Sequence, residues 1–197
     1  MNPIKNRKLN RLSGYDYSSE GAYFVTICVK DRMSVFGKII KDIFVLNEYG
    51  EIAQNVWEKL PQHYSHCKLD QFIVMPNHVH GIVWIIPDSV VGNGLKPFPT
   101  FAKPFPTFAK PFPTALPEII RGFKTFSSRR INETQSHFKF QWQKSYHDRI
   151  IRNEDELDRI REYIINNPAN WDKDSNRINE IRSALISTEL QKEKIND

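Results

Sequence analysis

The sequence predicts a single domain in which strands and amphipathic helices surround one central β-hairpin. The 197 residues are 40% hydrophobic and 12% aromatic, which is enough to build one well-packed core. An apolar run from Phe72 to Ile86 is interrupted once, at Pro76-Asn77, as expected for two buried strands joined by a tight turn. Apolar residues at helical spacing occur before and after this hairpin, so we expect other elements to cover the sheet.

Charge and composition exclude several classes of protein. The formal net charge is +5, but Lys96, Lys103 and Lys110 lie in a repeated segment, so the total says little about nucleic-acid binding. No apolar run approaches the ~20 residues of a membrane helix, and the first residues do not resemble a signal peptide. Two cysteines are too few for a disulfide framework or a cysteine-based zinc site. We therefore expect a cytoplasmic protein with no membrane partner.

Residues 1–20 are predicted to form a basic N-terminal arm. Four cationic side chains lie between Lys5 and Arg11, and Arg7, Lys8 and Arg11 are candidate contacts for phosphate groups. The alternative is a solvated tail, because charged runs are common at chain ends.

The first structured segment should follow the order strand, strand, helix. Residues 23–29 are rich in β-branched and aromatic side chains and predict the first strand, and residues 39–46 predict its pairing partner. Asn47 can cap a helix that continues to about Leu60, where Pro61 should end it.

The central hairpin, residues 68–86, carries two histidines directly after its turn. Side chains two apart on a strand share a face, so His78 and His80 project together while Val79 points into the core. This arrangement would give two nitrogen ligands to a divalent cation. Gly81 has no side chain, so we expect room there for the backbone of a ligand.

Two other interpretations of the histidine pair remain open. His78 and His80 would also fit a sheet as two buried histidines with satisfied hydrogen bonds. Alternatively, His63, His66 and Cys67 precede the hairpin and could join the pair around zinc, although nothing in the sequence orients them toward it.

Residues 96–115 are an internal repeat of seven-residue units that begin Lys-Pro-Phe-Pro-Thr. Proline at alternate positions excludes helix and sheet interior, and three short copies cannot bury a core of their own. We interpret the repeat as an expanded loop, with a docking segment for a partner or for DNA bases as the alternative.

The segment from Leu116 to Ile131 predicts an amphipathic helix with Pro117 near its start. Arg121, Lys124 and Arg129 lie away from its apolar face and form a candidate phosphate-binding strip. An ordinary solvated helix face is the alternative.

The last strand is predicted at residues 138–143, and a second amphipathic helix follows it. Asn153 should cap this helix, with Glu156 completing a capping box, and Pro168 should end it near Asn167. Leu157, Ile160 and Ile164 recur at helical spacing and form the buried face.

Tyr163 and Asn167 are four residues apart on this helix and therefore lie on one side of it. A tyrosine on a helix is usually a residue at the edge of a core, which is the simpler interpretation of Tyr163. Tyr146, beside His147, is a rival candidate for a nucleophile. Residues 173–197 are charged and sparsely apolar, and are predicted to form a C-terminal tail.

An ordered set of motifs resembles the REP-associated tyrosine transposases, a group of single-tyrosine HUH endonucleases. The motifs lie between residues 11 and 172, and they are Arg11 to Tyr17, Met75 to Gly81 with its His-hydrophobic-His signature, Arg121 to Lys124, Trp142-Gln143, Ile150 to Glu154, and Glu162 to Pro168. The repeat at 96–115 departs from the family pattern in a connection of variable length.

This resemblance implies a ferredoxin-like α+β HUH core, with an antiparallel sheet and helices packed on one face. The transposase domain would span residues 21–172 and include the 96–115 insertion. Its partner would be single-stranded or hairpin DNA, contacted by the basic residues named above and by Arg152, and the protein would associate with the nucleoid. The sequence is compatible with a homodimer and with a monomer.

The resemblance also implies a chemistry. Tyr163 would attack DNA at REP-type hairpins and form a 5′-phosphotyrosine, and His78, His80 and Asn167 would hold Mg²⁺ or Mn²⁺. Strand transfer is then the expected reaction. The alternatives are a hairpin-binding module without cleavage and a replication or relaxase-type nickase.

Overall fold

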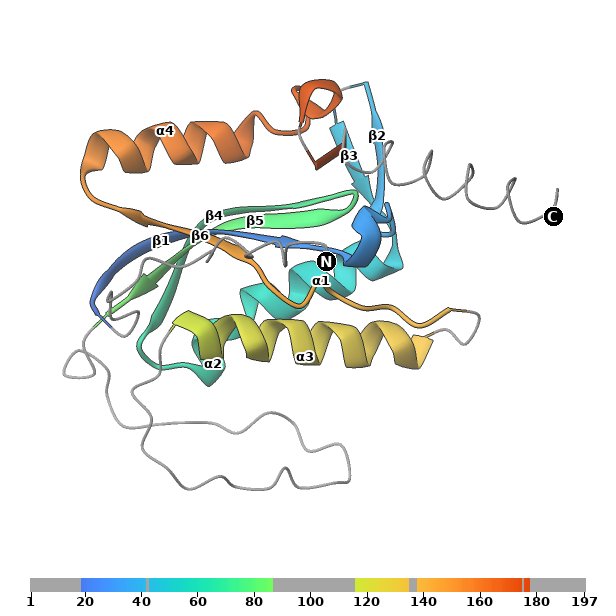
Figure 1. The fold of residues 1–197 in the computed structure, drawn as a ribbon, viewed down its shortest axis with the longest axis horizontal. Helices are drawn as coiled ribbons and strands as arrows, with labels where there is room; N and C mark the ends of the chain where they lie inside the picture. Colours follow the sequence, from blue (N-terminus) through green and yellow to red (C-terminus); the bar gives the residue numbers. More distant parts are fainter. Residues whose placement is uncertain (1–18, 42, 87–115, 135–137, 175, 178–197) are drawn as a thin grey trace, which may run out of the picture.

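A four-stranded antiparallel sheet forms the centre of the protein (Figure 1). The computed structural model describes residues 19–41, 43–86, 116–134, 138–174 and 176–177. The strand order is β4-β5-β1-β6, and the strands are β1 (Gly21–Cys28), β4 (Cys67–Met75), β5 (His78–Ile85) and β6 (His147–Ile151). A separate two-stranded hairpin consists of β2 (Gly37–Ile40) and β3 (Ile43–Leu46).

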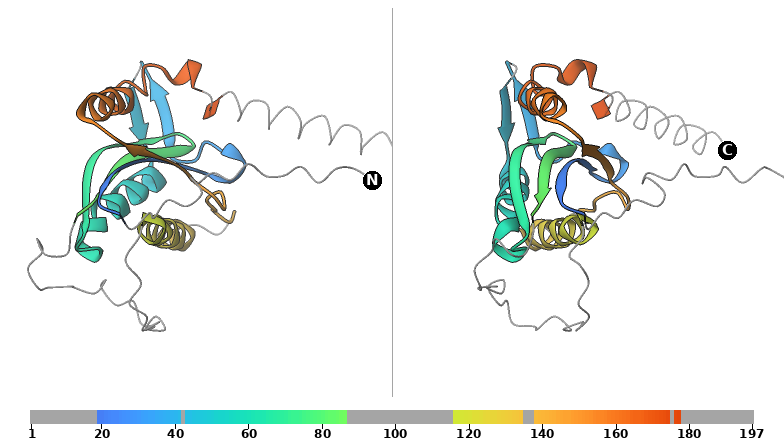
Figure 2. Two further views of the ribbon diagram at one scale, coloured as in Figure 1. Left: turned by 60° about the vertical axis from the view of Figure 1, so that its left-hand side comes forward. Right: turned by 90° about the vertical axis from the view of Figure 1, so that its left-hand side faces the viewer.

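Figures 1 and 2 both show helices on the two faces of the sheet. The helices are α1 (Glu48–Glu58), α2 (Leu60–His63), α3 (Leu116–Thr134) and α4 (Glu154–Ile165), with two short 3₁₀ turns at Lys30–Arg32 and Trp171–Lys173. With α1 after β1 and α3 after β5, the chain follows the β-α-β-β-α-β order of a ferredoxin-like fold. The predicted α+β class and antiparallel sheet are confirmed.

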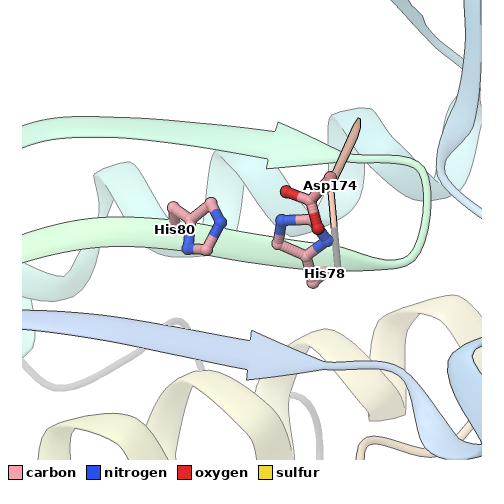
Figure 3. Close-up of side chains that lie close together, drawn as sticks. All are labelled: His78, His80 and Asp174. Atoms are coloured by element: carbon pink, nitrogen blue, oxygen red, sulfur yellow. The ribbon is translucent and has the colours of Figure 1, made fainter. Parts of the chain in front are cut away.

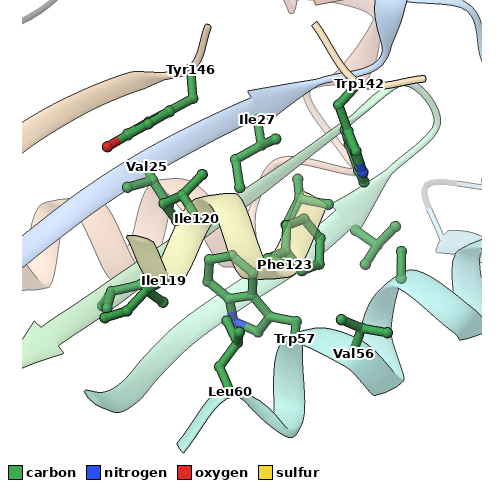
Figure 4. Close-up of a cluster of buried hydrophobic side chains, with 14 of the residues drawn as sticks. Val25, Ile27, Val56, Trp57, Leu60, Ile119, Ile120, Phe123, Trp142 and Tyr146 are labelled. Atoms are coloured by element: carbon green, nitrogen blue, oxygen red, sulfur yellow. The ribbon is translucent and has the colours of Figure 1, made fainter. Parts of the chain in front are cut away.

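The prediction that helices pack on one face holds for α1 and α3, whereas α4 covers the opposite face. Helices can cover both faces because successive side chains of β1 point to opposite faces of the sheet and are apolar on each face. Tyr23, Val25 and Ile27 join the larger core beneath α1 and α3, shown in Figure 4. Ala22 and Phe24 point the other way, into a smaller cluster with the apolar stripe of α4.

Two local predictions of strands were wrong. Residues 39–46 do not pair with β1 but contribute to the β2–β3 hairpin, because β1 is already flanked by β5 and β6. Residues 138–143 make a single bridge, between Val29 and Trp142, and the last strand is β6. The helix capped by Asn47 ends before Pro61, as predicted, and Pro61 then occupies the first turn of the short helix α2.

The predicted caps are confirmed with one change. Asn47 accepts hydrogen bonds from the Tyr49 and Gly50 amides at the start of α1, and Asn153 accepts one from the Glu156 amide at the start of α4. The Glu156 carboxylate reaches back to the amide of Arg152 rather than to that of Asn153.

Several predictions concern residues outside those that the structure describes. These are most of the N-terminal arm, with Arg7, Lys8 and Arg11, the repeat at 96–115, and the tail beyond residue 177. Within the described part of the chain, no helix is both long and apolar enough to cross a membrane.

Candidate functional site

The two histidines of β5 lie on the face of the sheet that α4 covers. His78 opposes Cys28 of β1 and His80 opposes Thr26, and both imidazoles are buried, with ring centroids 4.3 Å apart (Figure 3). Val79 points to the other face and joins the core beneath α1 and α3. The predicted shared face of the pair is therefore confirmed.

Asn77, in the turn before β5, fixes the orientation of His78. The Asn77 amide nitrogen donates to the carbonyls of Arg32 and Asn176, so its oxygen Oδ1 must face the imidazole. His78 Nδ1 lies 2.9 Å from this oxygen, which can only accept, so Nδ1 carries the proton. The other nitrogen, Nε2, then presents its lone pair to the site.

His80 sits between a hydroxyl and a phenol. Its Nδ1 lies 2.9 Å from Thr26 Oγ1, and its Nε2 lies 3.3 Å from the Tyr163 hydroxyl. The imidazole also stacks on Phe24, at a centroid distance of 5.3 Å. These contacts on several sides leave the imidazole of His80 little freedom to rotate.

Burial keeps both histidines neutral. It lowers the pKa of His80 to about 3, with a further lowering from the charge of Arg32. The pKa of His78 is held well below its ordinary value by burial, and then by the neighbouring His80 and Arg32. Neutral imidazoles are the form that can donate a lone pair to a cation.

Tyr163 reaches this pair from α4. Its side chain is 46% exposed, so the hydroxyl contacts His80 while part of the ring remains accessible to a large substrate. Burial raises the pKa of the phenol, the nearby Asp174 raises it further, and the side chain of Asn167 lowers it by hydrogen bonding. The phenol therefore keeps its proton at neutral pH unless another charge stabilises the phenolate.

Two buried atoms in the site match the ligand set expected for a cation. His78 Nε2 and Asn167 Oδ1 are both inaccessible to solvent and have no hydrogen-bond partner among the described residues. Buried acceptors without partners are rare and costly, and a bound cation would satisfy both. His78, His80 and Asn167 thus fit a divalent ion, as nitrogen and oxygen ligands.

One further acidic group, Asp174, lies at the site and was not predicted from the sequence. One carboxylate oxygen of Asp174 and one nitrogen from each of His78 and His80 lie within 4.8 Å of one another (Figure 3). The segment after α4 brings this residue back over the sheet, and Trp171 in the same segment stacks on His78 at 5.9 Å. An Asp seven residues after Asn167, in a charged region, carries no local pattern that could have identified it.

Among the residues that the structure describes, the basic side chains named from the sequence do not gather at this site. Arg121 and Arg129 are exposed on α3, on the opposite face of the sheet. Lys124 donates to the carbonyls of Gln143 and Ser145, so its ammonium holds the chain that leads into β6. Arg152 is exposed just before α4, at the end of the sheet away from the turn at Asn77.

Two rival interpretations of the sequence are not supported by the structure. Tyr146, the other candidate nucleophile, is buried in the core on the α3 face. His63, His66 and Cys67 do not join the cluster of His78 and His80 within the described residues.

The predicted role of Gly81 is also wrong. A Cβ atom at Gly81 would lie 2.3 Å from the Trp57 ring, so glycine makes room for a core side chain rather than for a ligand.

Comparisons with known proteins identify the family. The family model described as "Transposase IS200 like" matches residues 108–167, which include α3, β6 and Tyr163. An uncharacterized protein of Haemophilus influenzae is 37% identical over 171 residues, covering 87% of this chain and 93% of that protein.

Two solved structures are similar at lower identity. A REP-associated tyrosine transposase bound to a REP hairpin has a TM-score of 0.49 and 17% identity, over 80% of this chain and 73% of that one. A transposase from Deinococcus radiodurans has a TM-score of 0.45 and 18% identity, over 79% and 95%.

The family model carries the assignment, since the bacterial relative is itself uncharacterized. The model matches the part of the chain that contains the candidate nucleophile, and the relative matches almost the whole length. The expected kinship with transposases is confirmed. The segment of the chain that carries Tyr163 matches the family of IS200-like transposases.

Proposed function

We propose that this protein is a metal-dependent endonuclease and strand transferase for single-stranded DNA, which cleaves beside a hairpin and uses Tyr163 as its nucleophile. The observation that carries the proposal is the 3.3 Å contact between the Tyr163 hydroxyl and His80 Nε2. A half-exposed tyrosine beside two buried, neutral histidines places a nucleophile next to side chains that can bind a cation. The choice of hairpin DNA follows from the motif resemblance.

In the proposed reaction the Tyr163 oxygen attacks the scissile phosphorus. The bond from phosphorus to the 3′-oxygen breaks, the phenol loses its proton, and the 3′-oxygen takes one up, which leaves a 5′-phosphotyrosine and a free 3′-hydroxyl. His78, His80 and Asn167 would hold a divalent cation, Mg²⁺ or Mn²⁺, whose charge would polarise the phosphate.

The residues around the nucleophile have distinct roles in this proposal. Asn77 holds His78 in the tautomer whose Nε2 is free to bind a cation. The Asn167 side chain favours the phenolate, because hydrogen bonding to the phenol oxygen lowers the pKa of Tyr163. Asp174 is positioned as an additional anionic ligand.

The covalent link keeps the energy of the phosphodiester bond. A 3′-hydroxyl from the same or another strand can therefore attack the phosphotyrosine and restore a phosphodiester, with Tyr163 as the leaving group. Joining of strands, rather than hydrolysis, is the natural outcome. A hairpin-binding module that does not cut is the main alternative, and the orphaned acceptors of His78 and Asn167 argue against it.

The experiment is an assay for covalent protein–DNA adducts. End-labelled single strands containing a hairpin are incubated with protein and Mn²⁺, and label that remains on the protein after denaturation is counted. Tyr163→Phe should abolish the adduct while DNA binding stays close to that of the wild type, because only one hydroxyl is removed. Tyr146→Phe is the control and should keep the adduct.

Two results would overturn the proposal. One is an adduct that persists in Tyr163→Phe and disappears in Tyr146→Phe. The other is cleavage by the wild type that continues after a chelator has removed all divalent ions.

A further inference from the structure

Asp70 of β4 binds the helix that carries Tyr163. Arg161 on α4 donates to both carboxylate oxygens of Asp70, from Nε at 2.9 Å and from Nη2 at 2.6 Å. Trp84 of β5 donates its indole N–H to the same carboxylate at 3.1 Å, and the Gln71 amide donates at 2.7 Å. The carboxylate thus accepts four hydrogen bonds and connects two strands to the helix.

An irregularity of β4 turns Asp70 toward the helix. The pairing of β4 with β5 shifts register between Leu69 and Phe72, which marks a β-bulge. Because of the extra residue, Leu69 and Phe72 both pack against the larger core. Asp70 lies between them and points to the opposite face, where Trp84 and Arg161 lie.

Arg161 and Tyr163 lie on opposite flanks of α4. Successive helical residues are rotated by about 100°, so Arg161 follows the buried Ile160 on one side, and Tyr163 precedes the buried Ile164 on the other. A roll of the helix about its axis therefore moves both side chains at once. A constraint on Arg161 also fixes how far the Tyr163 hydroxyl stands from His80.

The apolar packing of α4 restrains this roll less precisely than directional hydrogen bonds do. Its buried stripe consists of Leu157, Ile160 and Ile164, and apolar contact has no preferred direction. A guanidinium that binds a carboxylate through two parallel hydrogen bonds has a fixed geometry. Arg161 also donates to Asp158 at 3.0 Å, one turn earlier, which orients its guanidinium further.

We propose that Asp70 and Arg161 are positioning residues, a clamp that sets the roll of α4 and so holds the Tyr163 hydroxyl at the histidine pair. The inference rests on the proposed function of Tyr163 as the nucleophile. Asp70 is not part of the cluster that Asp174 forms with the histidine pair. The clamp acts on the geometry of attack, where a displacement of 1 Å can cost roughly 100-fold in rate.

Two conservative variants test the clamp. Arg161→Lys keeps the charge but loses the two parallel hydrogen bonds, and Asp70→Asn keeps the shape but loses the charge. Each should slow adduct formation by about 10- to 100-fold at saturating hairpin DNA and Mn²⁺, while the Kd for DNA stays near the wild-type value. Hydrogen exchange should quicken in the second half of α4 and remain unchanged in β1 and β5.

The control is another ion pair on the same helix. Glu156 binds Arg149 at 2.6 Å and the Arg152 amide at 3.0 Å, both at the start of α4 and away from Tyr163. Glu156→Gln should loosen the first turn of the helix and leave the rate of adduct formation near that of the wild type. A purely structural role for the clamp predicts equal rate losses in all three variants.

The possible outcomes separate the two proposals. Wild-type rates in both Arg161→Lys and Asp70→Asn overturn the clamp, and so does a rate loss in Glu156→Gln as large as theirs. If the wild-type protein forms no adduct, the proposed function fails. The clamp is then tested by hydrogen exchange alone. Unchanged exchange of α4 in Asp70→Asn then overturns it.

Discussion

Replacement of Asn77 by Ala tests whether this side chain sets the tautomer of His78. The change removes the acceptor for His78 Nδ1–H, at 2.9 Å, and the two donations to the carbonyls of Arg32 and Asn176, at 3.1 and 3.3 Å. The proton of His78 is then free to move to Nε2, the nitrogen that a cation needs unprotonated. Asn77→Ala should therefore weaken cation binding without removing a ligand.

Two magnitudes follow from these contacts. Each hydrogen bond contributes about 0.5–1.5 kcal/mol, so the loss of three should lower the free energy of unfolding by roughly 2–4 kcal/mol. Loss of a residue that orients a metal ligand typically costs about 10- to 100-fold in affinity, which is about 1.4–2.7 kcal/mol of binding free energy.

The assay is a titration of the protein with Mn²⁺, followed by calorimetry, beside chemical denaturation without metal. Asn47→Ala is the matched control, because Asn47 likewise makes three hydrogen bonds, in its case accepting from two amides and donating to one carbonyl at the start of α1. It should lose about 1 kcal/mol of stability and bind Mn²⁺ normally. Equal Mn²⁺ affinities of the Asn77→Ala and wild-type proteins would refute the reasoning.

Three further predictions concern other parts of the chain. Gly81→Ala should destabilise the fold by about 1–3 kcal/mol in denaturant titrations, because its Cβ would meet Trp57, and Mn²⁺ affinity should stay unchanged. The pKa of Asp70 is lowered from its ordinary 3.8 to about 2, mainly by the hydrogen bonds from Arg161. The ionised carboxylate of Asp70 therefore stabilises the folded protein above pH 3.8, and this contribution is lost as the pH falls toward 2. The free energies of unfolding of the wild type and Asp70→Asn should hence converge as the pH is lowered. A difference between them that stays constant with pH would contradict the ion pair. Deletion of residues 96–109, two repeat units, should change loop-closure entropy by less than about 1 kcal/mol and preserve folding in thermal denaturation, whereas loss of hairpin binding would assign the repeat to recognition.

Much of the site could be predicted from the sequence because its signals are local. Alternation along a strand places His78 and His80 on one face whatever lies around them. Helical spacing, the Asn153 cap and Pro168 likewise define the helix that carries Tyr163 within a few residues. Each of these inferences depends on atoms that are near one another along the chain.

Strand pairing could not be predicted in the same way. Residues 39–46 have the composition of a strand that could pair with β1, but pairing is decided by competition among distant segments. β5 and β6 occupy both edges of β1, and the hairpin β2–β3 is left to pair with itself. The side of the sheet that α4 covers was also decided by long-range packing, since both faces of β1 are apolar.

The sequence by itself determined the histidine pair, the tyrosine and the helix that carries it, because periodicity and capping act over a few residues. Only the tertiary structure brought Asp174 to the histidines, directed the amide of Asn77 and joined Asp70 to Arg161, which are 91 residues apart in the chain. Such contacts depend on how three-dimensional packing closes long loops, and no local pattern of residues specifies that closure.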